Sequence, residues 1–302
     1  MTAGARNWRG DRCGRGASTI TFLLACWCAL AGADPLPNNS RLLATGGAIQ
    51  IEGQAGGGLV PWAVLAGYGS NDEFGASGFY THVELKDYAL DAFGIAVSFD
   101  NRIELSLARQ EFDLGTLGKA LGVPDQELRQ NIVGLKLRLV GDLIYGPLPQ
   151  FAFGLQYKRN LDFGIPSAVG ARYDDDADFY LSAAKLWLAG PFDRNLFANL
   201  TVRYTRANQG GLLGFGGDRG ATRELLLEGA VGVFVTRYVA IGAEYRQQPD
   251  KLSFSPQSDW FDAFVGVFPH KHGSLVAAYA DLGTIATLPH QRGWYLSLQL
   301  VF

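Results

Sequence analysis

The chain has 302 residues, of which 48% are hydrophobic and 18% are charged, and its formal net charge is −3. This apolar fraction is typical of a folded protein and excludes a disordered chain. The slightly acidic balance excludes a basic nucleic-acid-binding protein.

The first 33 residues have the pattern of a cleaved secretory signal peptide. Four arginines precede the apolar stretch Ile20–Leu30, and Ala31-Gly32-Ala33 is a small-residue cleavage site. The apolar stretch is shorter than the roughly 18 residues of a membrane-spanning helix. We therefore expect residues 34–302 to form a single exported domain. It has 22 basic and 28 acidic side chains, and none of the three cysteines.

Apolar and polar residues alternate along most of the mature chain, which indicates β-strands. Ile103, Leu105 and Leu107, for example, alternate with Glu104 and Ser106. Strands are expected at residues 46–54, 62–69, 73–84, 88–99, 101–112, 130–145, 149–158, 177–189, 196–207, 222–236, 238–247, 259–268, 272–281 and 293–302. This gives about 14 strands, or 12 if the first two belong to an irregular lead-in or a plug. The segment that could form this lead-in or plug is residues 34–61.

Short and long connections alternate between these strands. The short ones include Asp100-Asn101, Gly146-Pro147-Leu148 and Thr236-Arg237. The long ones are residues 113–129, 159–176, 208–221, 248–258 and 282–292, and a short helix is expected within 116–128. Outer-membrane barrels have short periplasmic turns and longer external loops. The pattern predicts an all-β fold, a closed antiparallel transmembrane β-barrel of about 12–14 strands.

One row of alternate positions carries charges of both signs. We expect this row to face the barrel lumen at Glu104, Lys136, Arg138, Lys158, Arg203, Glu224, Glu228, Glu244 and Arg246. A barrel of 12 to 14 strands is too wide for ordinary side chains to fill. These residues therefore suit a hydrated, ion-paired lumen. The alternative is the solvated outer face of a soluble sheet.

The final strand favours a membrane barrel over a soluble sheet. Its apolar row ends on the last residue and consists of Trp294, Leu296, Leu298, Leu300 and Phe302. This row resembles the C-terminal signal that outer-membrane barrels present to the barrel assembly machinery. We expect the row to face lipid, with outer-membrane lipid and lipopolysaccharide as neighbours. Leu298→Arg is then expected to block assembly, while Ser297→Arg on the lumen face is expected to be tolerated.

Three other features give weaker evidence of a functional site. His270 and His272 have a spacing that could bind a metal, but they lack further ligands and favour a polar turn. The acidic run at residues 174–178 lacks the later glycine and glutamate of a calcium-binding loop and favours a solvated external loop. The glycine-rich stretch at residues 210–220 favours a flexible external loop, or else a loop that folds into the barrel mouth. No cofactor and no metal site are expected.

The hypothesis that the protein is an enzyme rests on one group of residues. His82, near Ser77 and Asp87, is the one candidate catalytic constellation in the sequence. With several serines and four histidines, such proximity arises easily by chance. We therefore expect no enzyme activity.

Several segments resemble a proteobacterial family of exported proteins that is known only as a domain of unknown function. The resemblance spans roughly residues 42–302 and is carried by Thr45-Gly46-Gly47, Gln50-Ile51-Glu52-Gly53, Gly56-Gly57-Gly58-Leu59-Val60-Pro61-Trp62, Glu104-Leu105-Ser106-Leu107-Ala108-Arg109-Gln110, Gly214-Phe215-Gly216-Gly217-Asp218 and Gln291-Arg292-Gly293-Trp294-Tyr295-Leu296-Ser297-Leu298-Gln299. It implies an outer-membrane-type barrel and carries no activity or site residues.

The leading hypothesis for function is a passive pore or uptake channel for small solutes in the outer membrane. The mixed charges of the lumen would set a weak selectivity. A closed structural or surface-interaction barrel is the first alternative. An outer-membrane enzyme acting on lipid is the second.

Overall fold

The structure is a computed structural model that describes residues 41–302 except 121, 124–125 and 191–192. The expected signal peptide, residues 1–33, lies outside the described residues. Within the described part of the chain, no helix is long and apolar enough to cross a membrane.

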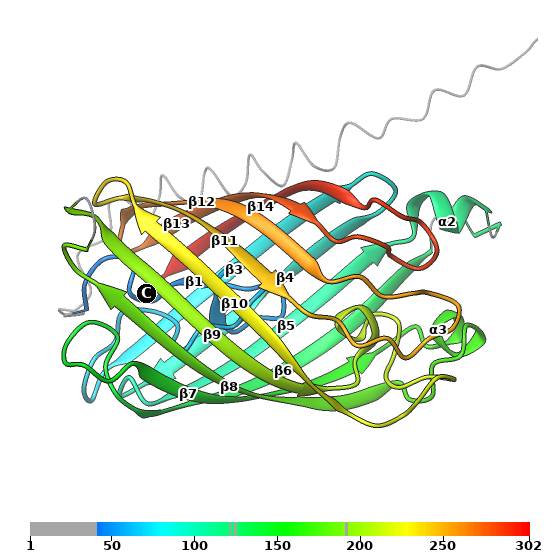
Figure 1. The fold of residues 1–302 in the computed structure, drawn as a ribbon, viewed down its shortest axis with the longest axis horizontal. Helices are drawn as coiled ribbons and strands as arrows, with labels where there is room; N and C mark the ends of the chain where they lie inside the picture. The colour runs from blue at the N-terminus through cyan, green and yellow to red at the C-terminus, as the bar shows by residue number, and fades with distance from the viewer. Residues whose placement is uncertain (1–40, 121, 124–125, 191–192) are drawn as a thin grey trace, which may run out of the picture. The chain divides into compact units, whose positions relative to one another are not determined.

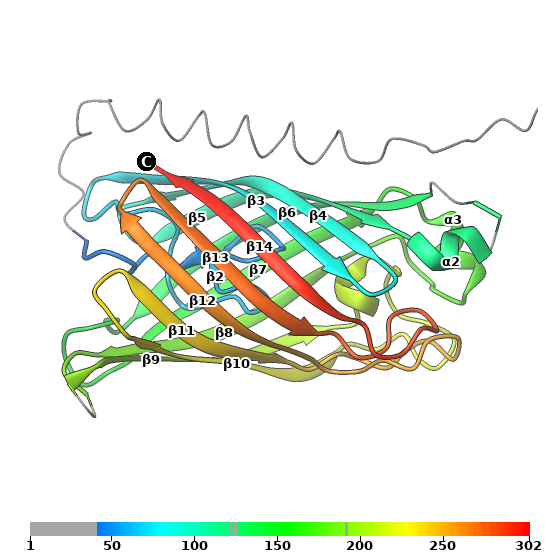
Figure 2. The same cartoon turned by 90° about the horizontal axis from the view of Figure 1, so that it is seen from above.

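Twelve antiparallel strands form a closed barrel, in which β14 pairs with β3 (Figures 1 and 2). This confirms the predicted fold class and selects 12 strands. The strands are β3 (Phe74–Leu85), β4 (Ala89–Phe99), β5 (Ile103–Asp113), β6 (Glu127–Val140), β7 (Gln150–Asn160), β8 (Asp175–Trp187), β9 (Asn195–Thr205), β10 (Glu224–Phe234), β11 (Val239–Arg246), β12 (Trp260–His270), β13 (Gly273–Asp281) and β14 (Arg292–Val301).

The two ends of the barrel differ in their connections (Figure 1). The end that carries the C-terminus, here called the turn end, has short turns. Asp100 and Asn101 both have positive φ angles, of 52° and 46°, as the two central residues of a type I′ turn require. The opposite end, the loop end, holds the longer loops with α2 (Gly115–Ala120), α3 (Gly164–Ala168) and the 3-10 helix η2 (Asn208–Gly211). The short helix expected within 116–128 corresponds to α2, which begins one residue earlier.

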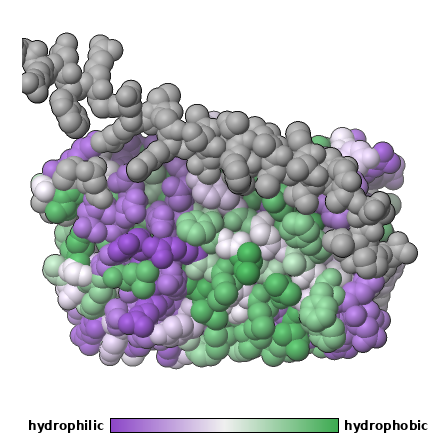
Figure 3. Space-filling model, turned by 180° about the vertical axis from the view of Figure 1, so that it is seen from behind, coloured by the Kyte–Doolittle hydropathy of each residue, from purple (hydrophilic) through white to green (hydrophobic). Residues whose placement is uncertain are grey.

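The outer face of the barrel is apolar. Figure 3 shows hydrophobic side chains gathered across the middle of one face, with more hydrophilic ones toward the ends. Large exposed apolar residues lie on many strands and include Ile95, Leu105, Leu107, Leu200, Leu225, Val231 and Trp294. Burying such a surface in water-free lipid is favourable, and closing the barrel leaves no unpaired strand edge there. The outer-membrane location predicted from the sequence agrees with this outer face.

Residues 41–70, here called the plug, lie in the barrel lumen and form no barrel strand. Every residue from 48 to 69 is buried. The plug contains two two-residue strands that pair with each other, β1 (Ala48–Ile49) and β2 (Ala55–Gly56), and Figure 1 shows them inside the barrel toward the turn end. The barrel-type strands expected at 46–54 and 62–69 are therefore wrong. The plug alternative is correct, and the plug extends beyond residue 61.

The lipid-facing row of β14 leads to the first prediction. Leu298 lies on the outer face between Leu275 and Tyr80. An arginine on the lipid face costs about 2–4 kcal/mol near the middle of the membrane. We expect Leu298→Arg to reduce strongly the amount of folded barrel in outer-membrane fractions, measured by heat-modifiable gel mobility, whereas Leu298→Ile should insert normally. Equal amounts of both variants would contradict the orientation of the strand.

The sequence predicts that Ser297→Arg is tolerated, and the structure argues against this. Ser297 does face the lumen, but its side chain is fully buried and accepts a hydrogen bond from Thr81 Oγ1 at 2.8 Å. A lumen filled by the plug has no room for an arginine at this position. We therefore expect Ser297→Arg to destabilise the barrel as well.

Candidate functional site

The buried ion pair of Glu104 on β5 and Lys136 on β6 holds two parts of the plug. Glu104 accepts hydrogen bonds from the backbone N–H groups of Ala55 at 3.1 Å and Ala66 at 2.7 Å. Lys136 Nζ donates to the carbonyl oxygens of Ala55 at 2.6 Å and Val64 at 3.0 Å. Both side chains are fully buried, and Nζ lies 3.6 Å from Glu104 Oε1. Charge-assisted hydrogen bonds to the plug backbone thus replace the water that would otherwise solvate this pair.

A second carboxylate binds the glycine-rich turn of the plug. Glu244 on β11 accepts hydrogen bonds from the N–H groups of Gly58 and Leu59, both at 2.7 Å, and from Trp62 Nε1 at 3.0 Å. A Cβ atom placed on Gly57 would lie 1.9 Å from Glu244 Oε1. The absence of a side chain at this position therefore allows the plug backbone to reach the carboxylate.

Six charged side chains meet near the turn of the plug at Glu52 and Gly53, here called its tip, and form the central ion cluster. Its cations are Lys158, Arg203 and Arg246, and its anions are Glu52, Asp178 and Glu228. Five members come from β7, β8, β9, β10 and β11, and Glu52 comes from the plug. All six are at most 3% exposed. The cluster has equal numbers of opposite charges, as a buried group of ions requires.

Glu52 completes the neutrality of the central ion cluster. Its carboxylate lies 2.6 Å from Lys158 Nζ, 2.8 Å from Arg246 Nη2 and 3.4 Å from Arg203 Nη2. Burial alone would raise the pKa of Glu52, but the charges of Arg246, Lys158 and Arg203 hold that pKa well below its ordinary value. Without Glu52, the barrel would bury three cations against two carboxylates. The plug therefore supplies a charge that the barrel needs when the lumen is dry.

Apolar packing also holds the plug near the turn end. The Trp62 ring lies 4.3 Å from the Phe197 ring and 6.4 Å from the Phe264 ring, measured between centroids. Trp62 is only 9% exposed. Burial of an aromatic side chain of this size contributes substantially to docking.

A loop also folds into the lumen, from the loop end. The segment Asn208–Phe215, between β9 and β10, is buried throughout. The carbonyl oxygen of Gly210 accepts a hydrogen bond from Lys158 Nζ at 3.1 Å, and that of Leu212 accepts one from Asn160 Nδ2 at 2.7 Å. Of the two alternatives for the glycine-rich stretch, its first part folds into the barrel.

The structure places all nine expected lumen residues in inward-facing rows, but it gives them different surroundings. Seven are buried against the plug or against one another: Glu104, Lys136, Lys158, Arg203, Glu228, Glu244 and Arg246. Arg138 lies toward the turn end beside Asp142, at 3.2 Å. Glu224 is exposed at the loop end, where it pairs with Lys251. The expected hydrated lumen is wrong for the seven buried residues, because plug backbone and opposite charges occupy the place of water.

The candidate catalytic constellation does not form. Ser77 faces the lumen and is 4% exposed, whereas His82 lies on the opposite, outer face of β3. His82 Nδ1 lies 2.8 Å from Asp91 Oδ1, and Asp87 accepts a hydrogen bond from Gln291. His82 follows Ser77 by five positions, an odd offset, which places the two side chains on opposite faces of the strand.

The expected solvated loop at residues 174–178 is also wrong for most of its length. Four of its residues form the start of β8, at Asp175–Asp178. Asp178 is buried in the central ion cluster, and Asp176 pairs with Arg206 and Arg223. Among the described residues, no group of three or more His, Cys, Asp or Glu is arranged to hold a metal ion.

The apolar row of the last strand faces outward. Trp294 is 67% exposed, and Leu296 and Phe302 are also exposed, whereas Tyr295 between them is buried in the lumen. The orientation is the one that the alternation predicts. The role of Trp294, Leu296, Leu298, Leu300 and Phe302 as an assembly signal stays a prediction.

Comparison with solved structures found barrels of the same kind at low sequence identity. The KdgM porin is 12% identical with a TM-score of 0.47, over 75% of this chain and 99% of that one. The outer membrane protein Omp33 of Acinetobacter baumannii is 9% identical with a TM-score of 0.45, over 77% and 99%. Outer membrane phospholipase A from Escherichia coli is 7% identical with a TM-score of 0.39, over 74% and 92%. These likenesses concern the fold alone.

Comparison with curated protein sequences found no match. The model of one protein family, described as a protein of unknown function (DUF3034), matches residues 45–299. The match covers the plug from Thr45 onward together with nearly all of the barrel. The chain therefore belongs to the DUF3034 family of proteins of unknown function.

Proposed function

We propose that the protein is an outer-membrane channel for small solutes whose pathway is closed by the plug and opens when the plug shifts. The observation that carries this proposal is the way in which the plug is held. Barrel side chains such as Glu104, Lys136 and Glu244 bind it through its backbone. Water can replace each of these contacts, because charged groups that line a lumen are readily hydrated.

The topology supports a plug that can move. A barrel of 12 strands is too wide to be filled by its own side chains. Here a separate segment fills it, and this segment continues into β3 at the turn end, where Phe74 begins the strand. The plug can thus shift toward that end while the barrel ladder from β3 to β14 stays paired.

A permanently closed barrel is the rival function, and one observation favours it. The packing of Trp62 against Phe197 and Phe264 is lost when the plug leaves. Exposing apolar surface of this kind to a wet lumen costs free energy. A barrel that never opens would retain this packing and would pass no solute.

Solute uptake by proteoliposomes tests the channel against the rival. We expect vesicles with wild-type protein to admit small neutral solutes faster than protein-free vesicles. A double variant, Gly53→Cys with Ala108→Cys, should lock the plug to β5 when oxidised and abolish uptake, and a reductant should restore uptake. Gly53 has a φ of 96°, which a cysteine adopts only with strain. A Cβ atom there would lie 2.6 Å from Ala108 Cβ, so the turn must back away by about 1 Å to reach disulfide geometry.

Gly53→Cys alone is the matched control and should respond to neither oxidant nor reductant. Wild-type vesicles that are as impermeable as empty ones would establish the closed barrel. Uptake that is equal in the locked and reduced forms would show that solutes do not pass the plug.

A further inference from the structure

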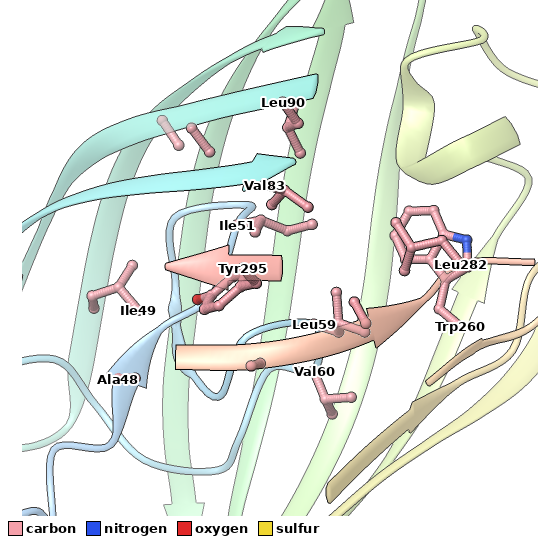
Figure 4. Packing of buried hydrophobic residues seen from close by; sticks show 14 of the residues in the cluster. Ala48, Ile49, Ile51, Leu59, Val60, Val83, Leu90, Trp260, Leu282 and Tyr295 are labelled. Carbon is pink, nitrogen blue, oxygen red and sulfur yellow. The ribbon is translucent and has the colours of Figure 1, made fainter. Parts of the chain in front are cut away.

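The lumen contains an apolar cavity between the tip of the plug and the loop end. Its volume is about 120 Å³. The plug contributes Ile51 and Leu59, and the barrel wall contributes Val83 on β3, Leu90 on β4 and Phe112 on β5. Figure 4 shows Ile51 near Val83 and Leu90, with Trp260 and Leu282 together on another side.

The loops contribute further apolar side chains to the same cavity. Leu213 belongs to the segment that folds inward between β9 and β10, and Leu282 and Ile285 belong to the loop between β13 and β14. Leu213, Leu282 and Ile285 are all at most 7% exposed. The cavity is therefore built jointly by barrel, plug and loops.

This apolar lining departs from the inner row of the same strands. On β5 the inner row carries Glu104, Ser106, Ala108 and Gln110 before Phe112. On β3 it carries Ser77, Phe79 and Thr81 before Val83 and Leu85. A lumen that held only water at this level would favour polar side chains here as well. The inner positions nearest the loop end of these two strands are apolar, at Val83, Leu85 and Phe112, and this level of the lumen marks a separate site.

We infer that this cavity binds a small apolar molecule, about the size of one aromatic ring or a short hydrocarbon chain. An apolar cavity of about 150 Å³ lined by Leu, Ile and Phe stays dry and takes up benzene. The cavity here has a similar volume and the same kinds of lining residues. Water inside it would find few hydrogen-bond partners, whereas an apolar guest gains contacts on all sides.

The inference that the bound molecule is a solute of the channel rests on the proposed function. The binding site itself does not depend on that function. Ile51 and Leu59 form the plug side of the cavity. An occupant therefore touches the element that closes the pathway. An apolar solute held there would be next to the central ion cluster, because Glu52 also lines the cavity.

Binding of fluorobenzene to the mature protein in amphipol, followed by ¹⁹F NMR, tests the inference. We expect a saturable signal of bound fluorobenzene with wild-type protein. Toluene should displace the bound fluorobenzene, whereas glycerol at the same concentration should not. Ala280→Phe on β13 should weaken binding at least tenfold, because Ala280 lines the cavity and the added ring fills it. If that variant does not fold, Ala286→Leu in the adjoining loop serves the same purpose.

Ala277→Phe is the matched control. It lies on the same strand, but it faces outward and lines no part of the cavity. It should keep wild-type binding. A signal that grows linearly without saturation, or that is equal in Ala280→Phe and Ala277→Phe, would overturn the inference.

The outcomes separate this inference from the proposed function. Saturable binding without any solute uptake would leave the site in place and contradict the channel. Uptake of small solutes without saturable binding of fluorobenzene would leave the channel in place and contradict the site.

Discussion

Deletion of residues 45–69 is expected to convert a nearly silent barrel into an open pore. The deleted residues fill the lumen, while the twelve strands that close the barrel lie outside them. The side chains that held the plug, such as Glu104 and Glu244, would then face water and line an aqueous path. In planar bilayers we expect the conductance to rise on the order of tenfold or more, since a 12-strand lumen emptied of its plug is too wide to close on itself.

Folding of the deletion variant is checked independently of its conductance. Heat-modifiable mobility reports whether the barrel has closed, and a lower thermal stability is expected because Phe197 and Phe264 lose their contact with Trp62. A folded deletion variant with the same low conductance as the full chain would contradict a closing role for the plug. High conductance of the full chain without any change on deletion would contradict it as well.

Glu52→Gln is expected to weaken the binding of the plug to the lumen without changing any residue of the barrel. The change leaves Lys158, Arg203 and Arg246 buried beside only two carboxylates, Asp178 and Glu228. Removing one partner of a buried ion pair typically costs about 3–5 kcal/mol. Because Glu52 belongs to the plug, this cost falls on the docked state and can be relieved by hydration when the plug shifts. We expect more frequent channel openings in bilayers and a lower melting temperature.

Asp250→Asn is the matched control for Glu52→Gln. Asp250 also carries a carboxylate and pairs with Arg219, but both of these side chains are exposed, by 48% and 43%. An exposed ion pair contributes only about 0–1 kcal/mol. The control should therefore open and melt like the wild type. Equal behaviour of the two variants would show that the central ion cluster does not hold the plug.

The barrel could be predicted closely from the sequence because its signals are local. Each strand from β3 to β14 alternates in polarity, and tight turns such as Asp100-Asn101 separate neighbouring strands. The lipid on one side and the polar lumen on the other impose the same period of two on every strand. The number of strands follows from that period if the segments 46–54 and 62–69 are assigned to a plug.

The plug could not be distinguished from strands by the same signals. Residues 46–54 and 62–69 are rich in apolar and small side chains, and the structure buries them on all sides rather than on one. Alternation is then no guide to which face is inside. The clustered glycines at 56–58 were the available sign, since Gly57 lies where a side chain would collide with Glu244.

The state of the lumen was equally hidden in the sequence. Charges such as Lys136, Lys158 and Arg203 suit a water-filled pore and a dry, ion-paired interior alike. Only their partners decide between the two, and these partners include plug backbone at Ala55 and the plug carboxylate of Glu52. Such contacts join residues about a hundred positions apart, which no local pattern reports.

The central claim is that the plug lies inside the lumen against β5, and cross-linking in the outer membrane tests it most directly. The cysteines of the chain, at positions 13, 26 and 28, all lie within the first 33 residues, which we expect to be cleaved as a signal peptide. On that expectation, introduced pairs are not confused with native ones. Gly53→Cys with Ala108→Cys should form a reductant-sensitive intramolecular link. Gly53→Cys with Leu107→Cys should form none, because Leu107 is 53% exposed on the lipid face of the same strand. A folded barrel that links neither pair, or both pairs equally, would contradict the account.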